Sequence, residues 1–277
     1  MKSSSANKSP EPSVTNMRKS LIKSKEKLSA DEFELIRILG TGGYATVWLA
    51  CFKSDPQKNP FALKIIQKSS ALAKKQENNV LTERRILSTL HHPAIVELVA
   101  SFQDKYCLYL LFEFLQGGEL FMLLKIQKRL NQSSVAFYLA EVTRGISFLH
   151  KHGIIYRDIK PENILITTKG HVKLVDFGFA KKLESSERTF TVCGTPEYLA
   201  PEVILPSRPG YTKKVDYWAL GVLTYELSTG YLNQNTTFLR RKAHPCLQKH
   251  SRAKFGDSQK CPASCARLYQ QPHCLRT

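Results

Sequence analysis

A short stretch near the middle of the chain gathers side chains that could carry out one reaction. It reads Y-R-D-I-K-P-E-N and is followed by V-D-F-G. Asp158 can accept a proton, and Lys160 can neutralise the charge of a phosphate. Asn163 and Asp176 can offer oxygens to a hard cation such as Mg²⁺. Phosphoryl transfer needs this set, because its transition state spreads negative charge over oxygens and requires positioning and neutralisation. The alternative is a polar loop between strands, but D-x-K-x-x-N followed by D-F-G rarely arises by chance.

These motifs resemble those of the protein kinases. That family carries H-R-D-L-x-x-x-N, D-F-G and A-P-E, and this chain has Y-R-D-I-K-P-E-N, D-F-G and, at residues 200–202, A-P-E. Tyr156 stands where the family more often has histidine. A lysine two residues after the aspartate, here Lys160, resembles the serine/threonine kinases. Y-R-D together with C-G-T-P-E-Y resembles the AGC group, which includes the cyclic-nucleotide-dependent kinases. The resemblance runs from about Phe33 to Tyr231.

The resemblance implies an α+β, bilobal protein-kinase fold with an antiparallel β-sheet N-lobe and a mainly helical C-lobe. It places the N-lobe and hinge at residues 31–115 and the C-lobe at residues 116–231. The family continues with Gly-Tyr-Pro-Pro-Phe and three further helices, whereas this chain diverges after Gly230 and Tyr231. We therefore expect an incomplete C-lobe, and a divergent, disordered tail at residues 232–277.

The net charge of +18 is concentrated at the two ends of the chain. Residues 1–30 carry +5, residues 231–277 carry +8, and the remaining residues carry only +5. The first thirty residues are rich in Ser, Lys, Asn and Pro, which predicts a disordered basic arm. Neither end shows a nucleic-acid recognition motif, so we expect no specific nucleic-acid partner.

Other features of the composition indicate an intracellular protein. No apolar run approaches the roughly 20 residues that span a bilayer, and the N-terminus lacks the apolar core of a signal peptide. We expect a cytoplasmic location, and the basic arm leaves a nuclear one open. Cys51, Cys107 and Cys193 lack metal-ligand spacing and should be reduced thiols. The four cysteines beyond residue 240 match no zinc-finger pattern.

A glycine-rich stretch joins two strand-like runs near the start of the resemblance. Gly40, Gly42 and Gly43 would let backbone N–H groups close over phosphates without a Cβ in the way. A plain hairpin also needs glycine, so the glycines alone do not decide. Ala45 stands in place of the family's third glycine. By resemblance, the loop that covers ATP comprises Leu39, Gly40, Thr41, Gly42, Gly43, Tyr44, Ala45, Thr46 and Val47.

The resemblance also assigns the rest of the ATP and Mg²⁺ site. Lys64 matches the lysine that pairs with the α- and β-phosphates. Glu83, in a helical pattern from Lys74 to Leu90, matches the glutamate that binds this lysine. Asp158 and Lys160 complete the catalytic set, and Asn163 and Asp176 are the metal ligands. The remaining positions at the nucleotide are Ala62, Glu113, Leu115, Glu119 and Leu165.

Two longer helices are predicted in the C-lobe. The pattern of Ser133–His152 places apolar residues on one face, and Gly153 is suited to end the helix. The segment Lys213–Gly230 is apolar nearly all round, which predicts a buried helix. By resemblance, Asp216 in this helix supports the catalytic loop.

The substrate and regulatory positions rest on the same resemblance. Thr191 matches the activation-loop phosphorylation site, whose phosphate would meet Arg157 and Lys181. Thr195 is expected to hydrogen-bond near the catalytic aspartate. Glu119, Glu162 and Glu226 match the acids that read arginines ahead of the acceptor residue in basophilic AGC kinases. Each alone would be an ordinary surface glutamate.

The sequence therefore predicts a serine/threonine kinase that transfers the ATP γ-phosphoryl group to basic peptides. Expected partners are protein substrates with basic motifs, and a regulatory subunit or an upstream activating kinase. A second hypothesis is a truncated kinase of weak or no activity that acts as a competitor or binding module. A third is a gene product that never folds stably, since the divergent tail replaces C-lobe helices.

Overall fold

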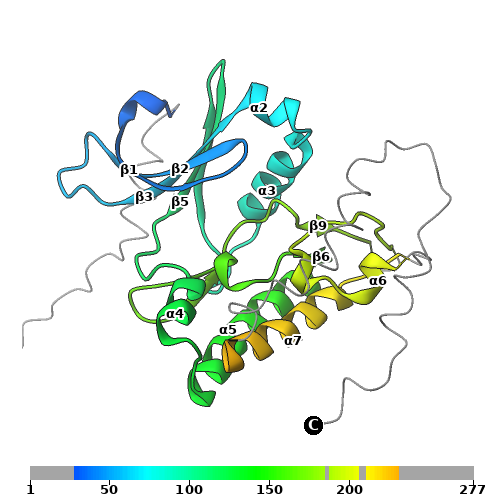
Figure 1. Cartoon of the computed structure of the whole chain (residues 1–277). Coiled ribbons are helices and arrows are strands. Elements are labelled where there is room, and N and C mark those ends of the chain that lie inside the picture. The colour runs from blue at the N-terminus through cyan, green and yellow to red at the C-terminus, as the bar shows by residue number, and fades with distance from the viewer. Residues whose placement is uncertain (1–27, 185–186, 206–209, 231–277) are drawn as a thin grey trace, which may run out of the picture.

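The computed structural model describes residues 28–184, 187–205 and 210–230. Its N-lobe is a five-stranded antiparallel sheet in the order β1-β2-β3-β5-β4 (Figure 1). The strands are β1 (Phe33–Thr41), β2 (Ala45–Phe52), β3 (Phe61–Gln67), β4 (Leu98–Gln103) and β5 (Cys107–Glu113). A 3₁₀ turn, η1 (Ala30–Glu32), precedes the sheet. This confirms the antiparallel N-lobe that was expected.

Aromatic residues form the core at one end of the sheet. Phe33 and Phe52 have ring centroids 4.5 Å apart, and Phe52 meets Phe61 edge to face at 5.6 Å. Leu28 and Ala30 pack against this cluster. The folded region therefore begins a few residues earlier than residue 31. Residues 1–27 of the predicted basic arm lie outside the described residues.

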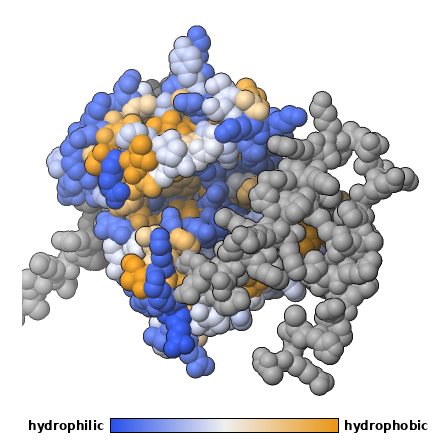
Figure 2. Space-filling model, viewed as in Figure 1, coloured by the Kyte–Doolittle hydropathy of each residue, from blue (hydrophilic) through white to orange (hydrophobic). Residues whose placement is uncertain are grey.

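The outer strand of the sheet carries apolar side chains on its surface. Leu35, Ile36 and Ile38 of β1 are exposed, and hydrophobic groups lie on this part of the N-lobe in Figure 2. Strand β1 pairs only with β2 among the described strands, through a register that shifts twice. The second shift lies between Ile38 and Gly40, where the strand enters the glycine loop.

The helix expected from Lys74 to Leu90 begins later in the structure, and a separate short helix precedes it. A short helix, α2 (Lys68–Ala73), ends before it, and α3 (Glu77–Thr89) begins three residues later than expected. Lys75 has φ 54°, and a residue in this left-handed region cannot continue an α-helix. The break redirects the chain, so that α3 runs beside the sheet and buries Glu83.

The C-lobe lies below the sheet and is mainly helical (Figure 1). Its helices are α4 (Leu120–Gln127), α5 (Gln132–Lys151), α6 (Pro201–Ile204) and α7 (Lys214–Thr229). Two small antiparallel pairs join β6 (Ile154–Ile155) to β9 (Lys181–Lys182), and β7 (Ile164–Ile166) to β8 (Val172–Leu174). The 3₁₀ turns are η2 (Pro161–Asn163) and η3 (Pro196–Tyr198). The bilobal α+β architecture expected from the sequence is thus confirmed.

Local sequence explains the ends of the two long helices. Asn131 caps α5, because its Oδ1 accepts a hydrogen bond from Ser134 N at 2.8 Å. Gly153 follows α5 with φ 72°. Gly230 ends α7 with φ 67°, and a Cβ there would lie 1.9 Å from the carbonyl oxygen of Lys128. Only glycine therefore fits at this position.

The burial of α7 differs from the expectation of a helix buried all round. Leu223 and Leu227 are fully buried and pack into the core shared with α5. Tyr217, Trp218 and Tyr225 are about half exposed, at 49%, 48% and 53%. One side of α7 packs against the described core and is buried. The other side also carries large hydrophobic residues, and these remain about half exposed. The expected tail at residues 232–277 and the boundary at Tyr231 lie outside the described residues.

The two lobes are connected by main-chain contacts behind the hinge. Leu174 N, in β8, donates to Ala94 O at 2.8 Å, and Val96 N donates to Leu174 O at 3.0 Å. These contacts tie the segment before β4 to the C-lobe. Among the helices of the described residues, none is long and apolar enough to cross a membrane.

Candidate active site

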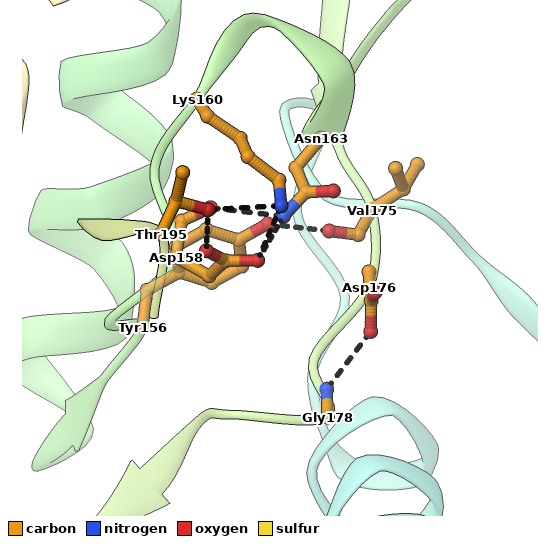
Figure 3. Close-up of polar contacts among 8 residues, drawn as sticks. All are labelled: Tyr156, Asp158, Lys160, Asn163, Val175, Asp176, Gly178 and Thr195. Atoms are coloured by element: carbon orange, nitrogen blue, oxygen red, sulfur yellow. Dashed lines mark hydrogen bonds and ion pairs between the residues drawn. The ribbon is translucent and has the colours of Figure 1, made fainter. Parts of the chain in front are cut away.

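The carboxylate of Asp158 is surrounded by three polar side chains (Figure 3). Thr195 Oγ1 donates to its Oδ1 at 2.8 Å, and Asn163 Nδ2 donates to its Oδ2 at 2.7 Å. Lys160 Nζ lies 3.2 Å from Oδ2 and donates to Thr195 Oγ1 at 3.0 Å. Asp158 is buried, whereas Lys160 is partly exposed. The site thus holds a fixed carboxylate with a cation beside it.

The backbone of this loop is held by a second, fully buried carboxylate. Asp216 of α7 accepts hydrogen bonds from Tyr156 N at 3.0 Å and Arg157 N at 2.8 Å. His150 Nε2, on α5, lies 2.7 Å from Asp216 Oδ2. Arg157 has φ 70°, an unfavourable conformation for a residue with a side chain. The contacts to Asp216 offset this cost immediately before Asp158.

Tyr156 connects the catalytic loop to the D-F-G segment. Its ring is fully buried and meets the ring of Phe177 edge to face, with centroids 5.2 Å apart. Its hydroxyl donates to the carbonyl oxygen of Val175. Burial, followed by the charge of Asp176, raises the pKa of Tyr156 well above its usual value, so it remains a neutral donor. Tyr156, at the position where the family more often has histidine, thus joins the catalytic loop to the strand end before Asp176.

The residues expected to bind metal offer suitable oxygens. Because Asn163 Nδ2 donates to both the carbonyl and the carboxylate of Asp158, its amide oxygen points away from that residue (Figure 3). Asp176 is exposed, and its Oδ1 accepts a hydrogen bond from Gly178 N at 3.1 Å. A carboxylate and an amide oxygen are the ligands that Mg²⁺ prefers. The donor set therefore fits a magnesium ion.

A buried ion pair links the sheet to α3. Lys64 Nζ, on β3, lies 2.7 and 2.9 Å from the two carboxylate oxygens of Glu83. Burial opposes the charge on this ammonium, but the carboxylates of Glu83 and Asp176 outweigh it and raise the pKa of Lys64. Lys64 is therefore positively charged. This pairing is the arrangement that kinases require for catalysis.

The glycine loop folds over this ion pair. Gly42 N donates to Ala45 O at 2.8 Å and so forms the turn between β1 and β2. Tyr44 is half buried, and burial raises its pKa, with Lys64, Glu83 and Asp176 close enough to contribute. Ala45 occupies the turn without a positive φ, so alanine is sterically compatible with this loop.

The other residues assigned to the nucleotide lie at the junction of the two lobes. Glu113 ends β5, and Leu115 is buried just after it. Leu165 lies on β7 and forms an antiparallel β-bridge with Glu119, which follows the hinge in the sequence. This bridge brings β7 of the C-lobe next to the segment that leaves the hinge. The partly buried positions are Leu39, Thr46, Val47, Ala62 and Leu165, and the exposed ones are Gly40, Thr41, Gly42, Gly43 and Glu119.

The activation segment contacts the catalytic loop through Tyr211, a residue that the sequence analysis did not name. Arg157 Nη1 donates to Tyr211 OH at 3.1 Å, and Tyr211 OH in turn donates to the carbonyl oxygen of Thr191. Thr191 itself is exposed. Lys181 Nζ lies 3.3 Å from Thr189 Oγ1. Arg157 and Lys181 are thus near the segment that carries Thr191, but their present hydrogen bonds go to other groups.

Three glutamates form a connected acidic cluster at the side of the site. Burial raises the pKa of Glu226 to about 7, and the charges of Glu162 and Glu197 add to this effect. Loss of water contact and the charge of Glu162 also raise the pKa of Glu119. Tyr198 OH donates to Glu226 Oε2. The charge of Glu162 acts on both Glu119 and Glu226, so these three glutamates, remote in sequence, lie near one another.

Comparison with known proteins identifies the family. The model of the protein kinase domain matches residues 33–271. This chain belongs to the protein kinase family. The match continues past Tyr231, where the sequence analysis placed the end of the resemblance. Membership implies ATP as the phosphate donor.

Similar proteins include kinases that depend on cyclic nucleotides. The chain is 46% identical over 210 residues to the cAMP-dependent protein kinase catalytic subunit of Dictyostelium discoideum, covering 76% of this chain and 31% of that protein. It is 42% identical over 213 residues to cAMP-dependent protein kinase type 3 of Saccharomyces cerevisiae, covering 76% and 52%. It is 46% identical over 197 residues to human cGMP-dependent protein kinase 2, covering 71% and 25%. The matched regions span at most about half of these relatives. These relatives confirm the expected likeness to the AGC group.

Sequence reasoning missed several residues that shape the site. His150, Tyr198 and Tyr211 contact Asp216, Glu226 and Arg157 respectively, across more than 25 residues in each case. No local pattern in the sequence signals such pairs.

Proposed function

We propose that this kinase transfers the γ-phosphoryl group of ATP to serine or threonine in peptides that carry arginine two and three residues before the acceptor. The observation that carries the proposal is the environment of Asp158. Thr195, Lys160 and Asn163 contact its carboxylate and fix its position. Asp216 accepts two hydrogen bonds from the backbone just before Asp158 and so fixes the conformation of the loop. A solvated surface acid would have none of these contacts.

Each residue has a distinct role in the proposed reaction. Asp158 orients the acceptor hydroxyl and takes its proton, while Lys160 neutralises charge on the transferred phosphoryl group. Lys64, held by Glu83, binds the α- and β-phosphates under the glycine loop. Asn163 and Asp176 would hold Mg²⁺, which supplies further neutralisation of phosphate charge when bound. The hinge residues Glu113 and Leu115 lie where the adenine base would bind.

The acidic cluster supports the proposed preference for basic peptides. The charge of Glu162 adds to burial in raising the pKa of both Glu119 and Glu226, so unfavourable repulsion acts on these two carboxylates while no cation is bound. An arginine guanidinium relieves this repulsion and can bind carboxylates through two hydrogen bonds. Tyr198 holds Glu226 in place through its hydroxyl. Arginine-containing segments are therefore the ligands that this surface favours.

The proposed reaction is tested by phosphate transfer from labelled ATP and Mg²⁺ to three peptides. The first has the sequence Leu-Arg-Arg-Ala-Ser-Leu, and the other two replace its serine with threonine or tyrosine. We expect label on serine and threonine and none on tyrosine. Binding of the first peptide without transfer to any of the three would instead support the hypothesis of an inactive binding module. Tyrosine as the preferred acceptor would contradict the proposal.

Recognition of arginine should depend on pH through Glu226. Its pKa of about 7 means that the carboxylate is charged above pH 7 and protonated below it. Because the guanidinium needs the charged form, the Kd of an arginine peptide should rise about tenfold between pH 8 and pH 6. Isothermal titration calorimetry at both pH values measures this. Glu226→Gln should remove most of the dependence, and an unchanged slope in that variant would assign the titration to another group.

The proposal extends to partners and location. Thr191 is exposed and therefore accessible to an upstream kinase, and its phosphate could draw Arg157 from Tyr211, because a charged acceptor forms the stronger hydrogen bond. A regulatory subunit with an arginine-containing segment would occupy the acidic cluster in the manner of a substrate. We place the protein in the cytoplasm.

A further inference from the structure

A half-buried ion pair joins the two lobes beside the hinge. Lys173 Nζ lies 2.5 Å from Glu113 Oε1. Glu113 is the last residue of β5 in the N-lobe, and Lys173 is the middle residue of β8 in the C-lobe. Their side chains are only 18% and 15% exposed. Salt screens such a pair much less than it screens a surface pair.

The carboxylate of this pair is fixed from a second direction. Glu97 N, just before β4, donates to the same Oε1 of Glu113 at 2.8 Å, and Glu113 N donates to Glu97 O at 3.1 Å. Glu113 therefore cannot turn toward solvent without losing main-chain contacts. The pair Lys58–Glu34 has a similar length of 2.6 Å, but its side chains are 50% and 53% exposed. It serves as a matched surface control.

The position of Lys173 connects the pair to the nucleotide site. Lys173 lies directly opposite Leu165 in the β7–β8 register, and residues directly opposite in an antiparallel pair share one face of the sheet. Leu165 is the residue assigned to the floor of the adenine pocket. Strand β8 then leads through Val175 to Asp176. The ion pair therefore joins the strand that enters the hinge to β8, the strand that pairs with the floor residue Leu165 on β7.

We propose that Lys173 is a positioning residue for the purine end of the nucleotide. Through Glu113 it holds the hinge and the β7–β8 floor at the separation in which the base fits between them. This inference rests on the proposed binding of ATP. Without the pair, only a fraction of molecules has the correct separation, and the apparent Kd rises by the inverse of that fraction. The phosphates contact Lys64 and the glycine loop instead, so their binding should change little.

The test compares ligands that represent the two ends of ATP. The Kd of adenosine and the Kd of tripolyphosphate with Mg²⁺ are measured by calorimetry for the wild type, Lys173→Met, Lys173→Arg and Lys58→Met. In Lys173→Met we expect the Kd of adenosine to rise about tenfold and that of tripolyphosphate to change less than about twofold. Lys173→Arg keeps a positive charge opposite Glu113 and leaves the hydrogen bond from Glu97 N intact, so it should restore most of the affinity for adenosine. Lys58→Met should bind both ligands as the wild type does.

Several results would overturn the inference. One is a Lys173→Met protein that melts at a lower temperature but binds adenosine with the wild-type Kd, since this would show a purely structural role. Others are equal weakening of both ligands, or a Lys173→Arg protein that binds adenosine as poorly as Lys173→Met. If Lys173→Met shows no cooperative melting, Lys173→Gln takes its place, with the same expected and contrary results. A wild type that binds neither ligand would refute the proposed ATP-dependent function itself, and this inference with it.

Discussion

Replacement of Asp158 by asparagine is expected to abolish phosphate transfer while the Kd of ATP stays within a few fold of the wild type. The substitution keeps the shape of the side chain, and the hydrogen bonds of Asp216 to the loop backbone are untouched. It removes the group that accepts the proton of the acceptor hydroxyl. Loss of a general base typically lowers the rate by about 100- to 10,000-fold.

The experiment measures turnover of an arginine-containing serine peptide together with ATP affinity by calorimetry. Asp31→Asn, at an exposed site in η1, is the matched control and should behave as the wild type. If Asp158→Asn keeps more than roughly a tenth of wild-type turnover, the assignment of Asp158 as the general base is wrong, because such a rate is incompatible with the loss of a general base. A loss of ATP binding to the same extent would instead place the residue at the nucleotide.

Removal of both arginines from a peptide substrate is expected to lower kcat/KM by at least about 100-fold, because each charge-assisted hydrogen bond contributes roughly 1.5 to 3 kcal/mol. The physical basis is the cluster of Glu119, Glu162 and Glu226. Glu119 and Glu226 are partly desolvated, and the negative charge of Glu162 repels both. A peptide with alanine at these two positions cannot offset that repulsion.

The assay compares the peptide pair Arg-Arg-Ala-Ser and Ala-Ala-Ala-Ser in the wild type and in two glutamine variants. Glu226→Gln should reduce the difference between the peptides, because it removes one carboxylate of the cluster. Glu34→Gln, on the exposed face of the N-lobe, should leave the difference unchanged. Equal rates on the two peptides in the wild type would refute the role of the acidic cluster.

The kinase-like identity of the chain was readable from short motifs. Y-R-D-I-K-P-E-N and D-F-G name the groups that phosphoryl transfer needs, and their spacing is local. The same holds for α5, whose apolar period and Asn131 cap fix its length. These features depend on neighbours within a few residues, which is the range over which sequence patterns carry information.

The sequence pattern did not predict the structure where two segments distant in sequence pack together. The late start of α3, after the turn at Lys75, goes with the position of α3 that buries Glu83 against Lys64 of β3. The burial of Leu223 but not of Tyr225 depends on the position of α5 beside α7. Neither outcome is encoded in the residues of the helix concerned.

The sequence by itself determined the chemistry of this protein: a carboxylate, lysines and oxygen ligands at the spacing of a kinase, with the family that this spacing indicates. The tertiary structure decided which of these groups are held and charged. Asp216 supports Tyr156 and Arg157 from about 60 residues away, Lys173 reaches Glu113 across the lobes, and burial raises the pKa of Glu226 to about 7. The physical reason is that desolvation and Coulomb energies depend on distance in space, which only the packed fold sets.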